Sequence, residues 1–89
     1  MQIKEIHHNK QFEDQFQALP KRIQSKACKT ERLFKENPFH PSLRLHKLKG
    51  KLAGLWSISI DKRYRIIFQP LENGVVLFIS VGIHAIYDK

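Results

Sequence analysis

The hydrophobic residues of this chain change their spacing halfway along it, and this change constrains the fold more than any other feature. In the first half, Asn9 stands where a helix N-cap belongs, and apolar residues follow at positions 12, 16 and 19. After Pro20, a second helical stripe occupies positions 23, 27, 30 and 34 and ends near Asn37 and Pro38. The first half therefore predicts two helices with a tight connection, a helical hairpin.

Three segments of the second half, residues 55–61, 63–70 and 75–83, alternate between apolar and polar residues or run apolar, as β-strands do. Glu72-Asn73-Gly74 separates the last two segments, and Asn-Gly is a strong hairpin signal. Residues 1–7 could add a short strand. The order β-α-α-β-β-β predicts an α+β fold, in which a small antiparallel β-sheet packs against the N-terminal helical hairpin. Without repeats or a linker, residues 1–89 are expected to form a single domain.

The period of two assigns the side chains of each predicted strand to two faces. Apolar residues share one face at positions 56, 58 and 60, at 64, 66 and 68, and at 75, 77, 79, 81 and 83. We expect these apolar faces to lie beneath the helices. The opposite faces then collect two arginines, three serines and a histidine, namely Arg63, Arg65, Ser57, Ser59, Ser80 and His84.

Charge restricts the possible partners. Sixteen Lys and Arg residues against eight Asp and Glu give a net charge of +8, which attracts nucleic acid or an acidic protein. A solvated basic surface without function is the alternative, and a membrane fits least because no basic helix carries large apolar anchors. The sequence has no apolar run of roughly 20 residues and no signal-peptide core at its N-terminus. We therefore expect a cytoplasmic protein, in which the lone Cys28 is a small buried residue.

The basic side chains concentrate in the segment from His40 to Lys51. Its leucines, at positions 43, 45 and 48, are expected to anchor the segment, while Arg44, Lys47 and Lys49 point outward with Lys51. Such cations supply affinity for a nucleic-acid backbone without sequence preference. A solvated loop is the alternative interpretation.

Five histidines raise the question of a metal site, but none has a cysteine partner or a short ligand spacing. The sequence therefore predicts neither a metal nor another cofactor. Metal-free cleavage of RNA by its own 2′-OH needs one group to take a proton, one to protonate the leaving oxygen, and cations around the phosphate. Histidine suits the proton transfers near neutral pH, and arginine or lysine suits the charge. Taken alone, a histidine such as His84 is more often a surface residue at the end of a strand.

An ordered set of segments resembles the RelE/ParE superfamily of type II toxin–antitoxin systems. The segments are His46-Lys47-Leu48-Lys49-Gly50, Leu55-Trp56-Ser57, Tyr64-Arg65-Ile66-Ile67-Phe68 and Val81-Gly82-Ile83-His84. The resemblance is closest to the mRNA interferases that carry a C-terminal catalytic histidine. It implies the fold expected above and a ribosome-dependent endoribonuclease that cleaves mRNA by 2′-OH attack. It further implies an acidic antitoxin protein that blocks the toxin in a hetero-oligomer, with mRNA and the ribosome as the other partners.

Carried over by position, the resemblance implies three catalytic residues. His46 falls on a catalytic histidine of some members, Arg65 on the strand arginine that stabilises the phosphate, and His84 on the C-terminal catalytic histidine. Tyr87 falls near a late aromatic residue that stacks on the base or orients it. The residues expected to bind RNA or the ribosome are Arg44, Lys47, Lys49, Lys51, Arg63 and Tyr87.

Two positions depart from the pattern of the superfamily. Ser59 stands where some members carry a further active-site histidine, and Ser80 stands where some carry an arginine. Two other functions therefore stay open. ParE-type members share the fold but inhibit DNA gyrase without cutting nucleic acid, and a basic nucleic-acid-binding domain would also account for the charge. His84 and the basic segment favour the ribonuclease.

Overall fold

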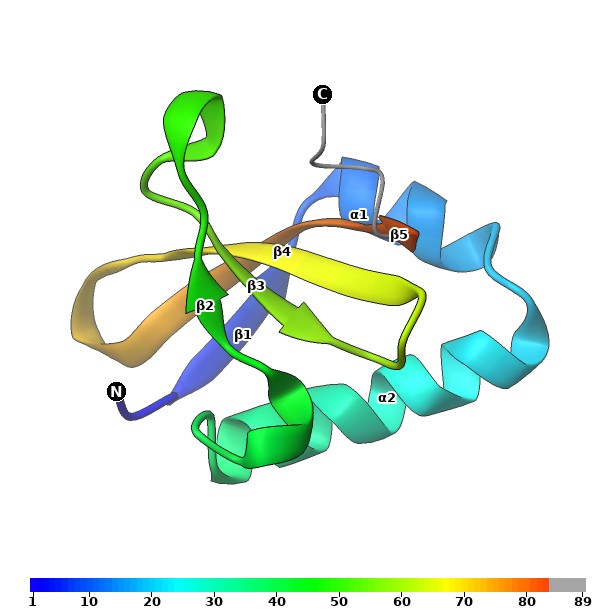
Figure 1. Cartoon of the computed structure of the whole chain (residues 1–89), viewed down its shortest axis with the longest axis horizontal. Helices are drawn as coiled ribbons and strands as arrows, with labels where there is room; N and C mark the ends of the chain where they lie inside the picture. The colour runs from blue at the N-terminus through cyan, green and yellow to red at the C-terminus, as the bar shows by residue number, and fades with distance from the viewer. Residues whose placement is uncertain (84–89) are drawn as a thin grey trace.

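The helices and strands follow the predicted order β-α-α-β-β-β, with one further short strand after the second helix. The computed structural model describes residues 1–83 (Figure 1). Its helices are α1 (Lys10–Gln17) and α2 (Lys21–Glu36), and its strands are β1 (Glu5–His8), β2 (His46–Lys47), β3 (Trp56–Ser59), β4 (Tyr64–Pro70) and β5 (Val75–Ile83). Three short 3₁₀ turns, η1 (Pro41–Leu43), η2 (Gly50–Leu52) and η3 (Glu72–Gly74), complete the order.

Helix α1 begins as expected after Asn9, whose side-chain oxygen accepts a hydrogen bond from the amide of Phe12 at 2.8 Å. The connection to α2 is held by Gln24, whose amide nitrogen donates to the carbonyls of Phe16, Gln17 and Leu19 at 3.1–3.2 Å. These carbonyls belong to the end of α1 and the turn after it, where helical partners are missing. The hairpin is therefore tied together by a side chain of its second helix.

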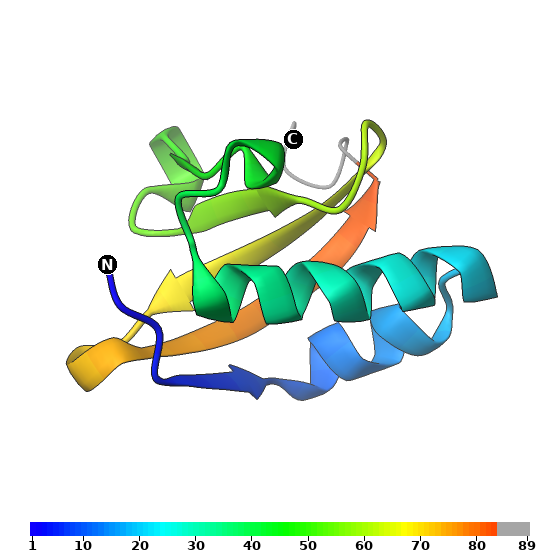
Figure 2. The same cartoon turned by 90° about the horizontal axis from the view of Figure 1, so that it is seen from below.

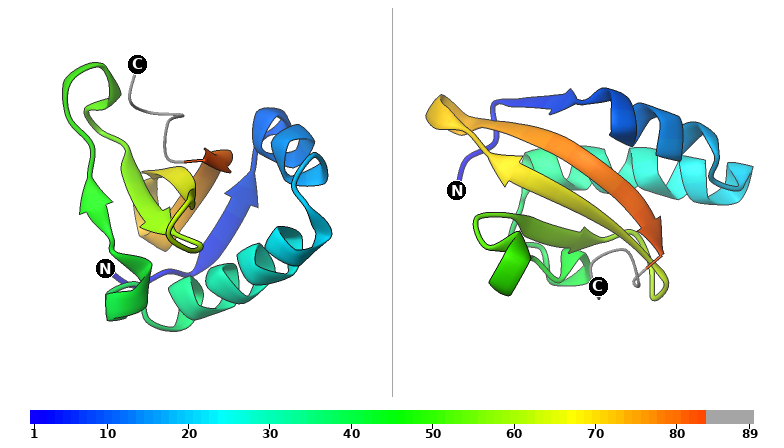
Figure 3. Two further views of the ribbon diagram at one scale, coloured as in Figure 1. Left: turned by 45° about the vertical axis from the view of Figure 1, so that its right-hand side comes forward. Right: turned by 90° about the horizontal axis from the view of Figure 1, so that it is seen from above.

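Helix α2 buries the stripe that the sequence predicts, at positions 23, 27, 30 and 34. Cys28 lies off this stripe and is exposed, so the expectation that it is buried was wrong. Figures 2 and 3 show α1 and α2 on the same side of the twisted sheet. Within residues 1–83, no helix is long and apolar enough to span a membrane.

The strands form a single mixed sheet in the order β1-β5-β4-β3-β2. Strands β3, β4 and β5 make the expected antiparallel meander, and η3 forms the turn between the last two. The predicted N-terminal strand forms one edge of the sheet as β1, and β2, which the sequence does not predict, forms the other edge. The two-residue strand β2 pairs antiparallel with β3, and β1 pairs parallel with β5, with Glu5 beside Val75. The predicted α+β class is confirmed, with a sheet that is antiparallel except at β1.

A β-bulge interrupts the pairing of β4 with β5. Ile67 pairs with Ser80, whereas the next residue, Phe68, pairs with Phe78. Ile79 is therefore an extra residue in β5. Because alternate residues of a strand face opposite sides, this extra residue exchanges the two faces of β5 at that point.

The bulge overturns the predicted core face over the first half of β5. Val76 and Phe78 are 2% and 0% exposed and belong to the hydrophobic core, whereas Val75 and Leu77 are only half-buried. Beyond the bulge, Val81 lies in the core as expected.

Aromatic rings join the sheet to the helices. The ring centroids of Phe34 on α2 and Phe68 on β4 are 4.9 Å apart, and those of Phe12 on α1 and Phe78 on β5 are 5.4 Å apart. Both pairs are tilted, as aromatic pairs prefer. These contacts identify the residues of β4 and β5 that face the helices.

Helix α1 also covers the edge of β5 beyond the end of β1. The Gln11 side chain donates to the carbonyl of Ile79 at 3.0 Å. The Gln15 side-chain oxygen accepts from the amide of Val81 at 2.8 Å and from the hydroxyl of Ser80 at 3.1 Å. Glutamine side chains thus take the place of a neighbouring strand, which satisfies backbone groups that an edge strand leaves unpaired.

Candidate nucleic-acid-cleaving site

The sheet side opposite the helices carries the buried polar residues of the strands. Ile58, Ile66 and Phe68 belong to the core, so the residues that alternate with them point to the other side. Ser80 joins these residues because it pairs with Ile67. We call this surface the polar face, and it consists of Ser57, Ser59, Arg65, Ile67 and Ser80, each no more than 9% exposed.

Arg65 lies on β4 between Ser59 of β3 and Gly82 of β5. It is 8% exposed, and its Nη1 donates to the carbonyl of Asp61 at 2.6 Å. A longer contact of 3.5 Å joins the same nitrogen to the carbonyl of Tyr64. A guanidinium has N–H donors on two further nitrogens. These contacts therefore hold the group in place and leave other donors able to bind a ligand.

Asp61 builds the turn between β3 and β4 that holds Arg65. Its Oδ1 accepts from the amides of Arg63 at 2.8 Å and Tyr64 at 2.9 Å. Burial alone would raise the pKa of Asp61, but these amide bonds and the charges of Lys26 and Arg22 outweigh it and lower the pKa below the ordinary value of 3.8. The carboxylate is therefore charged at neutral pH and fixes the turn.

His46 opens the two-residue strand β2 and lies directly across from Ser57. Its Nδ1 is 3.1 Å from the carbonyl oxygen of Arg44. Because a carbonyl oxygen only accepts hydrogen bonds, Nδ1 carries the hydrogen in this contact, and Nε2 is then the basic nitrogen of the neutral ring. This tautomer suits a proton acceptor.

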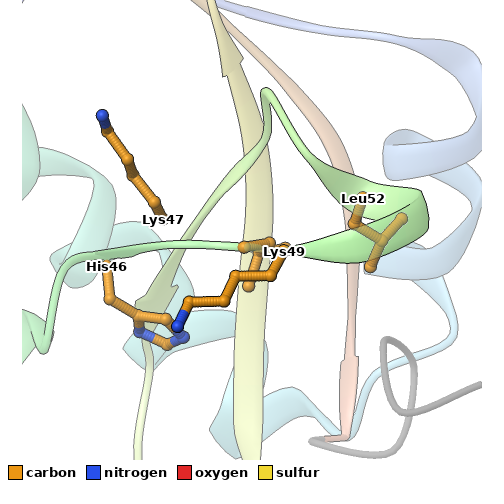
Figure 4. A pocket seen from close by; sticks show the side chains of 5 residues that line it. His46, Lys47, Lys49 and Leu52 are labelled. Atoms are coloured by element: carbon orange, nitrogen blue, oxygen red, sulfur yellow. The ribbon is translucent and has the colours of Figure 1, made fainter.

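Lys47 lies on the opposite side of β2 from His46. It pairs with Trp56, and its ammonium nitrogen lies 5.4 Å from the centroid of the indole ring. Figure 4 shows Lys47 pointing away from His46, whereas the Lys49 side chain extends toward it. The structure therefore separates two lysines that the sequence places together.

The other cations that the sequence assigns to RNA binding lie at exposed positions in turns and connections. Lys49 precedes the turn η2 and Lys51 lies within it, and a hollow there is lined by His46, Leu48 and Lys49, with Lys47 and Leu52. Arg63 lies in the turn between β3 and β4. Arg44 follows η1 in a left-handed conformation with φ of 47°.

A second hollow, of about 300 Å³, lies beside Arg44. Its lining consists of Ser42, Arg44, Ser59, Ile60, Asp61 and Lys62. Sequence reasoning missed Ser42 and Lys62, because neither belongs to a motif and only the fold brings η1 next to the turn after β3. The predicted residues His84 and Tyr87 lie outside the described residues.

The histidines near the N-terminus pair with carboxylates. His7 lies 3.1 Å from Glu5, and His8 lies 2.9 Å from Glu31 on α2. The His8 ring also stacks on Phe12, with centroids 4.8 Å apart. Among residues 1–83, no group of three or more His, Cys, Asp or Glu residues is arranged to hold a metal ion.

Several solved structures of bacterial toxins share this fold. The YoeB/ParE toxin from Agrobacterium tumefaciens is 24% identical, with a TM-score of 0.75 over 91% of this chain and 99% of that chain. YafQ from E. coli strain BL21(DE3) is 19% identical, with a TM-score of 0.76 over 94% and 96%. The toxin–antitoxin complex RelBE2 from Mycobacterium tuberculosis contains a chain that is 17% identical, with a TM-score of 0.74 over 89% and 95%. The fold is therefore that of the RelE/ParE toxins.

A family model narrows this class. Residues 4–84 match the RelE-like toxin of the type II toxin–antitoxin system HigB. No curated protein sequence matches the chain significantly. Because the family match spans nearly the whole sequence, this chain belongs to the RelE-like, HigB-type toxins of type II toxin–antitoxin systems.

Proposed function

We propose that this toxin is a cytoplasmic, metal-independent endoribonuclease that cleaves mRNA on the ribosome. One observation carries the proposal. His46 and Arg65 come from different strands, and both lie next to the serines of the polar face, with Ser57 beside His46 and Ser59 beside Arg65. A basic nitrogen and a planar cation beside one surface are two of the three kinds of group that 2′-OH attack on a phosphodiester requires, and a proton donor is the third.

In the proposed reaction, Nε2 of His46 takes the proton of the 2′-OH, whose oxygen attacks the adjacent phosphorus. Arg65 stabilises the charge that develops on the non-bridging oxygens. His84, which follows the Arg65 partner Gly82 by two residues in the sequence, gives a proton to the departing 5′-oxygen. The products are a 2′,3′-cyclic phosphate and a 5′-hydroxyl.

The exposed cations in turns and connections supply binding in this proposal. Lys49, Lys51 and Arg44 would contact phosphates of the message or of the ribosome, together with Arg63. Lys47 would bind the message or the ribosome from the other side of β2, and Tyr87 would stack on a base. Such contacts position the substrate and carry no sequence preference.

We also propose an acidic antitoxin as the protein partner. The net charge of +8 favours an acidic chain through long-range attraction, which accelerates association mainly at low salt. The toxin–antitoxin complex RelBE2 shows that a protein of this fold is found bound to an antitoxin. The association rate with the antitoxin should fall steeply as ionic strength rises, and a rate independent of salt would contradict this proposal.

Incubating the purified toxin with ribosomes programmed with a defined mRNA, followed by mapping of new 5′ ends, tests the proposed activity. We expect cleavage that depends on the ribosome. It should persist when EDTA removes transition-metal ions, with Mg²⁺ kept in excess over EDTA so that the ribosomes stay intact. A parallel DNA gyrase supercoiling assay tests the ParE-type alternative. If the message stays intact and supercoiling is inhibited, the toxin is a gyrase inhibitor and the proposed ribonuclease activity is refuted.

A further inference from the structure

Two hydroxyl groups on the polar face are buried without a hydrogen-bond partner. Ser57 is 0% exposed and Ser59 is 6% exposed, and neither Oγ atom has a hydrogen-bond partner among residues 1–83. Ser80, on the same face, is also buried, but its hydroxyl donates to Gln15. Buried polar groups are nearly always paired, and an unpaired one destabilises the folded protein. Within the described part of the chain, two hydroxyl groups at neighbouring positions on one face of β3 therefore have no hydrogen-bond partner.

These two hydroxyls lie between the proposed catalytic groups. Ser57 and Ser59 are two residues apart on β3, so they point to the same side of the sheet. Ser57 lies across from His46 on β2, and Ser59 lies across from Arg65 on β4. Directly opposed residues of antiparallel strands have their Cβ atoms about 4.5–5.5 Å apart. One ligand group held over the serines would therefore be within reach of both neighbours.

The surroundings of Ser59 favour an anion. Ser59 contributes to the hollow of about 300 Å³ beside Arg44 and Lys62, which is at the lower end of the volumes of small-molecule sites. Asp61, the carboxylate in the lining, is already engaged by the amides of Arg63 and Tyr64. The cations are therefore the charged groups that would attract a ligand there.

We infer that the Ser57 and Ser59 hydroxyls are a phosphate-binding pair, which donates hydrogen bonds to the non-bridging oxygens of a phosphate held between His46 and Arg65. The inference rests on the proposed function and names two further substrate-contacting residues for it. Both oxygens are closed to water in the free protein, so the phosphate must displace neighbouring groups. Arg65 is adjacent to Ser59, and a phosphate would compete with the Asp61 carbonyl for its guanidinium. Binding satisfies the donors that have no partner within residues 1–83.

Thermal unfolding in inorganic phosphate and in sodium chloride at equal ionic strength tests the pair without any catalysis. The variant is Ser57→Ala/Ser59→Ala, and the matched control is Ser80→Ala, which removes a buried hydroxyl that has a partner. In chloride we expect the double variant to melt at or above the wild-type temperature and Ser80→Ala to melt below it. Phosphate should raise the melting temperature of the wild type and of Ser80→Ala, and this increase should vanish in the double variant. A full phosphate response in the double variant, or a loss of stability in chloride as large as that of Ser80→Ala, would overturn the inference.

Single-turnover cleavage on saturated, programmed ribosomes tests whether the phosphate is that of the message. We expect the double variant to cleave about 10²-fold more slowly, since removal of one donor to a developing negative charge typically has an effect of this size. Its half-saturating concentration should stay within about twofold of wild type, and Ser80→Ala should cleave at close to the wild-type rate. A double variant that cleaves at the wild-type rate contradicts the inference. A wild-type protein that cleaves nothing refutes the proposed ribonuclease instead, and the unfolding experiment then decides on the serine pair alone.

Discussion

Replacing Gln15 tests how α1 stabilises the sheet. In Gln15→Leu the side chain keeps a similar size but loses the oxygen that accepts from the amide of Val81 at 2.8 Å and the hydroxyl of Ser80 at 3.1 Å. Val81 is 2% exposed, so its amide would be left buried without an acceptor. An orphaned buried donor destabilises by about 1–3 kcal/mol, and the lost hydroxyl bond adds about 0.5–1.5 kcal/mol. We expect the free energy of unfolding to fall by about 2–4 kcal/mol.

Urea denaturation followed by circular dichroism measures this loss, and two further variants control for it. Gln15→Glu retains an oxygen that can accept both bonds and should stay within about 1 kcal/mol of the wild type. Gln11→Leu removes a hydrogen bond that an exposed side chain donates to the Ile79 carbonyl. Water can donate to this carbonyl instead, so the free energy of unfolding should fall by less than in Gln15→Leu. If Gln15→Leu lowers the free energy of unfolding by less than about 0.5 kcal/mol, well below the expected effect of losing a buried hydrogen bond, then Gln15 does not stabilise the edge of β5 in this way.

Three other predictions concern the site. His46→Ala and His84→Ala should each slow single-turnover cleavage about 10²–10⁴-fold and remove opposite limbs of its pH profile; a loss below tenfold for either variant would remove it from the proposed mechanism. Lys49→Ala/Lys51→Ala should weaken binding to programmed ribosomes and flatten its salt dependence, while the cleavage rate at saturation stays close to wild type. Because the pKa of Asp61 is lowered by folding, its ionised form stabilises the protein above pH 3.8, and this contribution disappears as the pH falls through the lowered pKa. The stability difference between the wild type and Asp61→Asn in urea should therefore shrink from pH 7 to pH 3, and a constant difference would contradict the assigned role of this carboxylate.

The helices could be predicted because their pattern repeats over several turns. Asn9 caps α1 as expected, and the α2 stripe ending at Phe34 is buried. The face of β5 could not be predicted in the same way. Its residues are almost all apolar, so alternation does not identify the buried side, and nothing in the sequence marks Ile79 as the extra residue of a bulge. The error follows directly: every residue before the bulge was assigned to the wrong side.

The site was only partly predictable for a related reason. Arg65 and Ser59 could be placed on one face, because both belong to strands with clear alternation. Strand β2 has two residues, too few to show a period, so the sequence could not tell that His46 and Lys47 point to opposite sides. The unpaired state of the Ser57 hydroxyl depends on what the folded chain brings next to it, which no local pattern contains.

Because β1 pairs in parallel with β5, the sheet can be completed only after β5 has been synthesised. Glu5 pairs with Val75 and His8 with Phe78, so each residue of the first strand meets its partner only after 70 further residues have been synthesised. Contacts between residues so distant in sequence slow folding, because a long loop must close before the contact forms. A nascent chain still attached to the ribosome that makes it therefore holds β1 and α1 without the strand they pack on. The toxin should acquire its finished sheet only after β5 has emerged from the ribosome.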